Sequence, residues 1–383
     1  VVCVLTYKDV PATKVWTHFE AVGIAPGAEP ILAVDKVRWK GEPIVAVVAE
    51  TLKQAEDGAA KVKVSYEKLP SVLDVDASLA EGAPNLFECW PDNHYLFPDD
   101  HAAAQIRFGD AEKGFAEADH IVEHSYQTRP IEQAPIETAG CVAVPGSDGR
   151  FTIYTNSQSL SNTRNNAAEI AGISPGDLHL IGGTAGGGFG GKVDMAIEPM
   201  ALLAAMKSKR PVRYRFTRED EMTVSSTRAA WRVSIKDGVM QDGRIVARYV
   251  TTHQDVGAYL RNSIYGAFKH ASHMPGPYSV PNVWADVFCV FTNRTPSAAM
   301  RGFGVMPASF AIEMQMDRIA KAIGMDPWLL RLKNAFRNGD MKAHRREVWD
   351  AALVETIQAT ARLVGKVLPD EFKQMSSDKR LGV

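Results

Sequence analysis

The chain has 383 residues, of which 45% are hydrophobic and 23% are charged, and its formal net charge is -2. This is the composition of an ordinary soluble globular protein, with a length that suits about two or three domains. The near-neutral charge gives no support for nucleic acid or an anionic membrane as a partner, and no apolar stretch approaches the ~20 residues that cross a bilayer.

Residues 31–75 predict a small α/β unit, and a further strand is expected before it. The apolar run at 1–5 favours a buried strand over a methionine start or a signal peptide, so we expect the chain to begin inside a domain. A continuous apolar run at 44–49 predicts a strand that is covered on both faces. Residues 62–66 alternate between apolar and polar side chains, which is typical of a strand.

A helix is expected between these two runs. Thr51 is a candidate N-cap, and Ala55, Ala59 and Ala60 can face inward from the turns that follow. Residues 76–108 are rich in Pro, Asn and Asp and show little periodicity, which indicates a linker and a domain boundary near 80–110.

The second region mixes strands and helices without strict βαβ alternation, which predicts an α+β fold. Gly172 and Gly324 follow two amphipathic segments as left-handed caps, and Pro199 suits a first helical turn. Strands are expected at 151–155, 178–181, 212–217, 231–239 and 244–253, the last two as a hairpin around Asp242-Gly243. Helices are expected at 162–171, 199–207, 307–323, from Pro327 behind the cap Asp326, and near 353–364.

The four cysteines are scattered, and no two of them have CxxC spacing. Neither zinc nor an iron–sulfur cluster is therefore expected on the cysteines of this chain alone, and a disulfide framework does not suit a chain of this size. We expect buried free thiols at Cys3, Cys89, Cys141 and Cys289.

Residues 186–192 read GGGFGGK, with five glycines in seven residues. Glycine loses more backbone entropy on ordering than any other residue, so such a run indicates a backbone that closely approaches a flat or anionic ligand. The run fits the P-loop pattern GxxxxGK, but Val193 stands where that loop needs Ser or Thr for magnesium. It also contains GxGxxG, but residues 182–185 separate it from the preceding strand, and Glu219 lies well beyond the ~20 residues expected for the ribose-binding acid.

A third interpretation is a family resemblance that covers most of the chain. The GGGFGGK run, Gln158 at the end of an upstream strand and the sequence AMRGFG at 299–304 together resemble the molybdenum hydroxylases, the xanthine oxidase and aldehyde oxidoreductase family. Asp326-Pro327 with Arg331 and Asn334 is similar to the family's sequence after these motifs. Within the family, the chain resembles the nicotinate dehydrogenase branch.

The resemblance implies a fold and a cofactor. Residues 1–80 would form a hammerhead-like α/β domain without its first part, 81–108 a linker, and 109–383 the first half of a molybdopterin-binding α+β domain. Molybdenum would be held by the dithiolene of a molybdopterin, in its cytosine dinucleotide form, and by no protein side chain. Iron–sulfur and FAD centres on partner subunits would accept the electrons.

The resemblance also assigns roles to residues. Gln158 would hydrogen-bond an oxo ligand of the metal, and Arg301 would stabilise negative charge on the substrate or cofactor. Phe303 would stack on a flat substrate. The alternatives are a polar residue at a strand end, a structural ion pair and a core phenylalanine. Cofactor contacts are expected from Gly188, Phe189, Gly190, Ala299, Met300 and Arg301.

Two departures from the family pattern concern the substrate. Val193 stands where purine-hydroxylating members carry a glutamate, which argues against xanthine and leaves aldehydes or other aromatic heterocycles. Lys269 aligns with the family's second substrate-binding arginine.

A third departure concerns the general base, because the family's base glutamate has no counterpart here. Glu219 and Glu221 lie in a charged turn and are expected to be solvated. A second molybdopterin subunit would therefore supply the base.

The resulting expectation is the molybdopterin-binding subunit of a cytoplasmic, multi-subunit hydroxylase that is catalytic only with this partner. It would oxidise a nicotinate-like N-heterocycle with oxygen derived from water. An aldehyde oxidoreductase subunit and a non-catalytic assembly subunit are the alternatives, and neither nucleic acid nor a membrane is expected as a partner.

Overall fold

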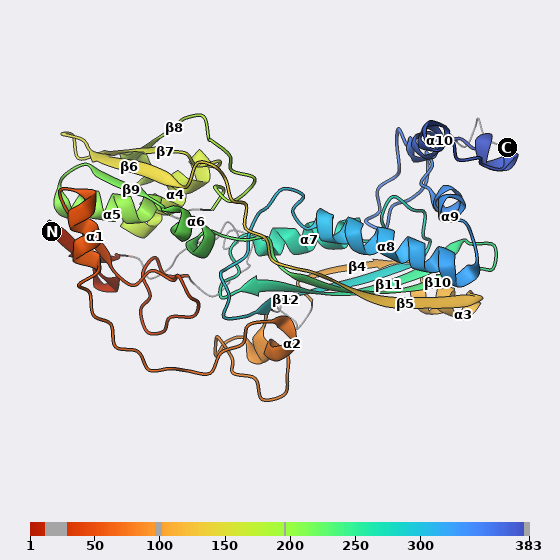
Figure 1. Cartoon of the computed structure of the whole chain (residues 1–383), viewed down its shortest axis with the longest axis horizontal. Helices are drawn as coiled ribbons and strands as arrows, with labels where there is room; N and C mark the ends of the chain where they lie inside the picture. Colours follow the sequence, from red (N-terminus) through yellow and green to blue (C-terminus); the bar gives the residue numbers. More distant parts are fainter. Residues whose placement is uncertain (12–28, 96–101, 195–196, 379–383) are drawn as a thin grey trace.

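A computed structural model describes residues 1–11, 29–95, 102–194 and 197–378 of the chain. The molecule is elongated, with a four-stranded sheet near one end and a six-stranded sheet toward the other (Figure 1). A two-stranded sheet at the N-terminus packs beside the four-stranded one. Because helices and mostly antiparallel sheets coexist without βαβ repetition, the predicted α+β class is confirmed.

The N-terminal pair of strands is smaller and more exposed than the sequence suggests. β1 (Cys3–Leu5) pairs antiparallel with β2 (Ala46–Val48), which is half-buried rather than covered on both faces. Thr51 caps α1 (Leu52–Ala59) as predicted, and its hydroxyl accepts a hydrogen bond from the Gln54 amide at 3.3 Å.

Two predictions in this region are wrong. Ala59 and Ala60 are exposed, and α1 buries none of its residues, because a two-stranded sheet offers the helix little apolar surface. Residues 62–66 form no strand. No other segment of the described part of the chain pairs with them, and their side chains are exposed.

The four-stranded sheet has the order β8-β7-β6-β9, with β7 and β8 parallel and the other pairs antiparallel. Two helices cover one face and leave the other open (Figure 1). Gly172 ends the first of them with a φ of 67°, and Pro199 lies in the first turn of the second, both as predicted. These elements are β6 (Gly140–Pro145), β7 (Phe151–Thr155), β8 (Leu178–Gly182), β9 (Val212–Arg215), α4 (Leu160–Ala171), α5 (Glu198–Ser208) and, beside them, α6 (Arg218–Val224).

The six-stranded sheet has the order β3-β12-β11-β10-β5, and β4 also pairs with β12. The predicted hairpin is confirmed as β10 and β11, whereas β5 and β12 have no counterpart among the predicted strands. α7 and α8 cover one face of the sheet, and α3 packs on the other. The bounds are β3 (His94–Tyr95), β4 (Ala104–Phe108), β5 (His120–Thr128), β10 (Trp231–Val239), β11 (Ile245–Gly257), β12 (Val283–Phe291), α3 (Ala111–Glu117), α7 (Ser263–His273) and α8 (Val305–Ile323).

The remaining helices are short or lie at the C-terminal end. Asp326 caps α9 (Pro327–Asn334) through the Trp328 amide, and α10 (Leu353–Leu363) packs on it around a small third core, both as predicted. α2 (Val75–Ser78) and α11 (Asp370–Lys373) are single turns. None of the described helices combines the length and the apolar character that crossing a membrane requires.

Residues 81–108, expected as a linker, contribute β3 and β4 to the large sheet, and 96–101 lie outside the described residues. The domain limits 1–80, 81–108 and 109–383 stay a prediction.

All four cysteines are free, but only two of them are buried. Cys141 and Cys289 lie in the two large cores, and burial raises the pKa of both thiols. Cys3 is half-buried and Cys89 is exposed, so the expectation of four buried thiols is wrong for these two. Cys3 lies in an outer strand and Cys89 in an irregular segment, where neither is fully covered.

Candidate functional site

Two glycine-rich loops meet between the two large sheets. The first glycine loop (186–192) follows β8, and the second glycine loop (299–304) leads into α8. The Arg301 amide donates a hydrogen bond to the Phe189 carbonyl at 2.8 Å. A Cβ atom added to Gly190 would lie 2.5 Å from the Ala299 carbonyl oxygen. The two motifs, distant in sequence, therefore touch through their backbones, and any larger residue at position 190 would separate them.

The glycines of the first loop are needed for contacts within the protein. Gly190 has a φ of 105°, in the region that favours glycine, and a Cβ at Gly188 would clash with the side-chain amide of Gln158. Part of the glycine content that suggested a ligand therefore serves loop packing. Between the two glycines, Phe189 has a φ of 51°, a conformation that costs about 1 kcal/mol or more for such a residue, and its side chain is 47% exposed.

Gln158 fixes the first loop with its amide oxygen. That oxygen accepts hydrogen bonds from the Gly190 amide at 3.0 Å and from the Lys192 amide at 3.3 Å. The side chain is exposed, so its Nε2 donor is the part that can face a ligand. The Gly190 amide is thus already bonded to Gln158 in this structure, and the cofactor contact expected at Gly190 stays a prediction.

Lys192 ends the first loop inside the protein. Its side chain is 2% exposed and its Nζ lies 2.8 Å from Glu137 Oε2, which also accepts from the Gly186 amide at 2.7 Å. The hydrogen bond from Lys192 and the Gly186 amide keep the pKa of Glu137 below its usual value. A lysine in this position cannot reach nucleotide phosphates, which excludes the P-loop interpretation.

The second loop carries the predicted substrate residues. Arg301 is exposed, and Phe303 is half-buried against Gly266 of α7. The Lys269 ammonium, also on α7, lies 5.7 Å from the centre of the Phe303 ring. The structure thus brings Lys269 and Phe303 together as a cation and an aromatic face. Val193 closes the first loop, with its amide donating to the Gly190 carbonyl at 3.1 Å.

Glu221 does not behave as predicted. It is 1% exposed, and its Oε2 accepts a hydrogen bond from the Ala139 amide at 2.7 Å. The reason is that α6, begun by a Thr217–Asp220 capping box, turns this side chain toward Ala139, the residue before β6. Glu219 is exposed, as expected.

Sequence reasoning also missed Gln133 and Arg228, two buried residues that support the second loop. Gln133 Nε2 donates to the Ala299 carbonyl at 2.9 Å, and Arg228 Nη2 donates to the Arg301 carbonyl at 2.6 Å. No motif marks either residue, because each acts on a backbone carbonyl that only the fold brings within reach.

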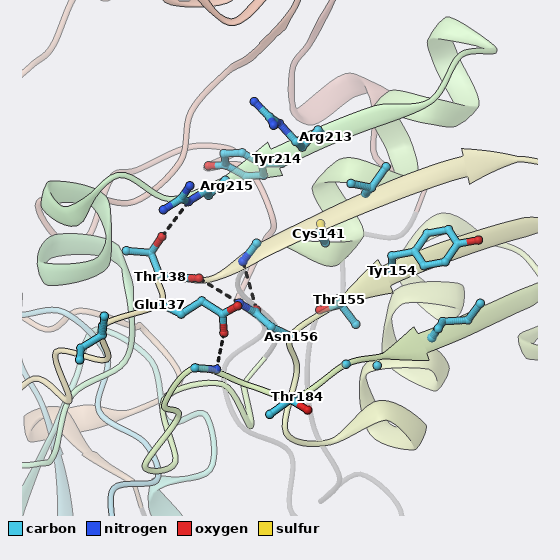
Figure 2. A pocket seen from close by; sticks show the side chains of 17 residues that line it. Glu137, Thr138, Cys141, Tyr154, Thr155, Asn156, Thr184, Arg213, Tyr214 and Arg215 are labelled. Carbon is cyan, nitrogen blue, oxygen red and sulfur yellow. Dashed lines mark hydrogen bonds between the residues drawn. The ribbon is translucent and has the colours of Figure 1, made fainter.

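A cavity of about 710 Å³ lies over the open face of the four-stranded sheet (Figure 2). Tyr154, Cys141, Tyr214 and the arginines of β9 line it, and it reaches the first loop only at Gly186 and its partner Glu137. Its lining includes neither Gln158 nor Arg301, so the cavity and the meeting point of the loops are different places.

The donor set at the loops suits a polar organic group better than a bare cation. Within the described ranges no three His, Cys, Asp or Glu side chains gather as metal ligands. The loops instead offer a free amide donor on Gln158, an exposed guanidinium on Arg301 and a backbone surface kept clear of Cβ atoms by Gly188 and Gly190. A molybdopterin, which carries its own metal ligands, fits these groups.

Two family models match the chain. Residues 94–335 match the molybdopterin cofactor-binding domain. Residues 1–70 match the a/b hammerhead domain of aldehyde oxidase and xanthine dehydrogenase.

Individual relatives agree with these models. The nicotinate dehydrogenase large molybdopterin subunit of Eubacterium barkeri is 32% identical over 93% of this chain and 80% of its own length. The xanthine dehydrogenase of Emericella nidulans is 29% identical over 90% of the chain and 24% of its own length. The solved aldehyde oxidoreductase of Desulfovibrio gigas superposes with a TM-score of 0.88 at 30% identity, covering 94% of this chain and 40% of that one. The chain thus spans less than half the length of two of these three proteins.

Proposed function

Since this chain belongs to the molybdopterin-binding family of xanthine dehydrogenases and aldehyde oxidoreductases, we propose that it is the molybdopterin subunit of a multi-subunit hydroxylase acting on a nicotinate-like N-heterocycle. The observation that carries the proposal is the contact between the two glycine loops, which gathers Gln158, Phe189 and Arg301 at one place. A relative of which the chain spans 80% is itself named as a large molybdopterin subunit, which supports a role within a complex.

The bound cofactor would supply the oxidation, with oxygen derived from water. Gln158 would donate its free Nε2–H to an oxygen of the cofactor, because its amide oxygen is already bonded within the loop. The Arg301 side chain is exposed beside the contact between the two glycine loops, and it would stabilise negative charge on the bound substrate or cofactor. The chain's contribution is therefore position and electrostatics.

Lys269 and Phe303 support a heteroaromatic acid as the substrate class. A flat ring can stack on Phe303, and the neighbouring ammonium of Lys269 would attract a carboxylate on that ring. Val193, unlike the glutamate that purine-hydroxylating members carry at this position, supplies no carboxylate that could hydrogen-bond a purine ring. An aldehyde oxidoreductase subunit is the second candidate, favoured by the close superposition on the aldehyde oxidoreductase of Desulfovibrio gigas.

The general base would come from a second molybdopterin subunit. Glu137 beside the first loop pairs with Lys192, and Glu221 of α6 accepts from the Ala139 amide, so both carboxylates are engaged in the fold. We further propose the cytosine dinucleotide form of the cofactor, partner subunits with iron–sulfur and FAD centres, and a cytoplasmic location.

The test is native purification of the complex through a tag on this chain. We expect molybdenum, iron and flavin by elemental and optical analysis, CMP released on acid hydrolysis, and a partner subunit by mass spectrometry. Nicotinate and an aromatic aldehyde are then compared as substrates. A complex without molybdenum would support the assembly-subunit alternative, and turnover by the purified chain alone would contradict the partner-supplied base.

A further inference from the structure

Gln133 lies between the two glycine loops and is 7% exposed. Its Nε2 donates to the Ala299 carbonyl of the second loop at 2.9 Å. On its other side it packs on the first loop, where a Cβ added to Gly191 would lie 3.1 Å from Gln133 Cδ. One side chain therefore contacts both loops at once.

Arg228 supports another carbonyl of the second loop. It is also 7% exposed, and its Nη2 donates to the Arg301 carbonyl at 2.6 Å. Its own backbone is held by a bridge to Ile131, with the Arg228 amide 2.8 Å from the Ile131 carbonyl. Ile131 is two residues before Gln133, so both supports come from adjoining backbone.

The charge of Arg228 has no counter-ion among the described residues. Its Nε and Nη1 are buried without a hydrogen-bond partner among the described residues, and burial alone, with no neighbouring carboxylate, lowers the pKa of this guanidinium. A buried cation without a partner is strongly unfavourable, which a residue kept only for packing would not require.

We propose that Gln133 and Arg228 are positioning residues that hold the second glycine loop in place against the first. They donate hydrogen bonds to the carbonyls of Ala299 and Arg301, and the Arg301 amide donates to the Phe189 carbonyl. Three hydrogen bonds thus set the backbone from 299 to 301 and direct the Arg301 side chain outward, with the Arg228 charge directly behind it. The inference rests on the proposed function for its link to turnover, but the loop geometry is independent of it.

The chain contains matched controls for both residues. Arg248 is 0% exposed and donates to the Pro275 carbonyl at 3.1 Å, and Gln315 is 0% exposed and donates to the Val122 carbonyl at 3.0 Å. Arg248 lies on β11 and Gln315 on α8, both contact the buried Asp237, and neither binds a group of the two glycine loops. The variants Arg228→Lys and Gln133→Met are therefore compared with Arg248→Lys and Gln315→Met.

Hydrogen exchange of the purified complex is the first measurement, and it needs no bound cofactor. Arg228→Lys and Gln133→Met are expected to speed exchange at the amides of 299–304 by about tenfold, because each removes a bond from a loop with few others. The control variants are expected to lower Tm while leaving that segment at the wild-type rate. Equal acceleration in controls and variants, or none in the variants, would overturn the proposal.

Turnover per bound molybdenum is the second measurement. The loop variants are expected to lower kcat about tenfold or more, with KM changed less, since a misplaced Arg301 affects the reacting geometry. Arg228→Met should be worse than Arg228→Lys, which keeps the charge. If the wild-type complex holds no molybdenum, the proposed function fails while the exchange experiment still decides this inference. Unchanged kcat per molybdenum in both loop variants would remove the link to the reaction.

Discussion

Gln158 bonds the first glycine loop with its amide oxygen, and its Nε2 is the group proposed to face the ligand. Gln158→Glu keeps an oxygen for the Gly190 and Lys192 amides but replaces the Nε2 donor. We expect less than about 1 kcal/mol change in the free energy of unfolding, with a loss of about tenfold or more in kcat of the assembled enzyme. Gln158→Ala should lose activity and also about 1–3 kcal/mol, because two loop amides lose their acceptor. Urea titration and steady-state kinetics check both, and full kcat in Gln158→Glu would contradict the donor role.

Asp194, directly after the first loop, makes stability depend on pH. Burial raises the pKa of its carboxyl to about 6 despite the nearby Arg261 charge, and the Asn262 Nδ2 donates to it at 2.7 Å. Since the folded pKa lies above the unfolded value near 3.8, the native state binds the proton more tightly, and stability falls as pH rises from about 4 to 6.

The neutral variant Asp194→Asn should remove this dependence. Relative to wild type it is expected to be nearly neutral near pH 4 and more stable above about pH 7, by up to about 3 kcal/mol. Urea unfolding of both proteins at several pH values measures the difference directly. A difference that stays constant across this range would show that Asp194 keeps its charge in the folded state.

α8 has a glycine at each end, and the two should respond very differently to the same substitution. Gly304 has a φ of 75°, and an added Cβ would clash with the Gly266 carbonyl of α7, while Gly324 has a φ of 68° with no atom within 4 Å. Gly324→Ala should therefore cost about 1 kcal/mol for the backbone alone. Gly304→Ala must also push α7 and α8 apart and should cost well above that, at least about 3 kcal/mol.

Thermal unfolding of the two alanine variants measures this difference, with far-UV circular dichroism as the check on helix content. Gly304→Ala is further expected to disturb His270, whose ring nitrogen Nδ1 lies 2.9 Å from the Gly304 carbonyl. Similar Tm values for the two variants would mean that the helices can separate without cost, contrary to the packing described.

The elements that the sequence predicts well are those with local signals. Gly172 and Gly324 end α4 and α8, and Asp326 begins α9, because a cap acts on backbone groups within one turn. Strand pairing has no such local marker. Residues 62–66 alternate like a strand yet have no partner in the described structure, whereas β12 is an apolar run interrupted by Asp286 and is identified as a strand only through its pairing with β11 and β4.

The candidate site likewise contains residues with a local sequence signal and residues whose contacts are long-range. Gln158, Phe189 and Arg301 could be predicted because they belong to motifs. Gln133 and Arg228 could not, since their partners are backbone carbonyls 166 and 73 residues away. The motifs therefore predict which residues belong to the candidate site, and the fold is needed to see which residues hold them in place.

Across the whole molecule, the N-terminal segment joins the two large cores. Leu32 is 1% exposed in the core of the four-stranded sheet, and Trp39 is 3% exposed in the core of the six-stranded sheet. Between the same regions, Glu29 forms a bidentate ion pair with Arg261 at 2.6 and 2.8 Å. This short stretch therefore packs into the cores of both sheets.

Truncating each anchor should loosen a different sheet. Leu32→Ala is expected to cost about 2–5 kcal/mol and Trp39→Ala about 3–5 kcal/mol, because both leave cavities in packed cores. Hydrogen exchange should accelerate in α4, α5 and β6 for the first variant and in β10, β11 and β12 for the second. If the two cores respond independently, the double variant should add the two costs within about 0.5 kcal/mol. Acceleration of both sheets by either single variant would mean that the two sheets unfold as one cooperative unit, and that the contact between the glycine loops itself transmits stability.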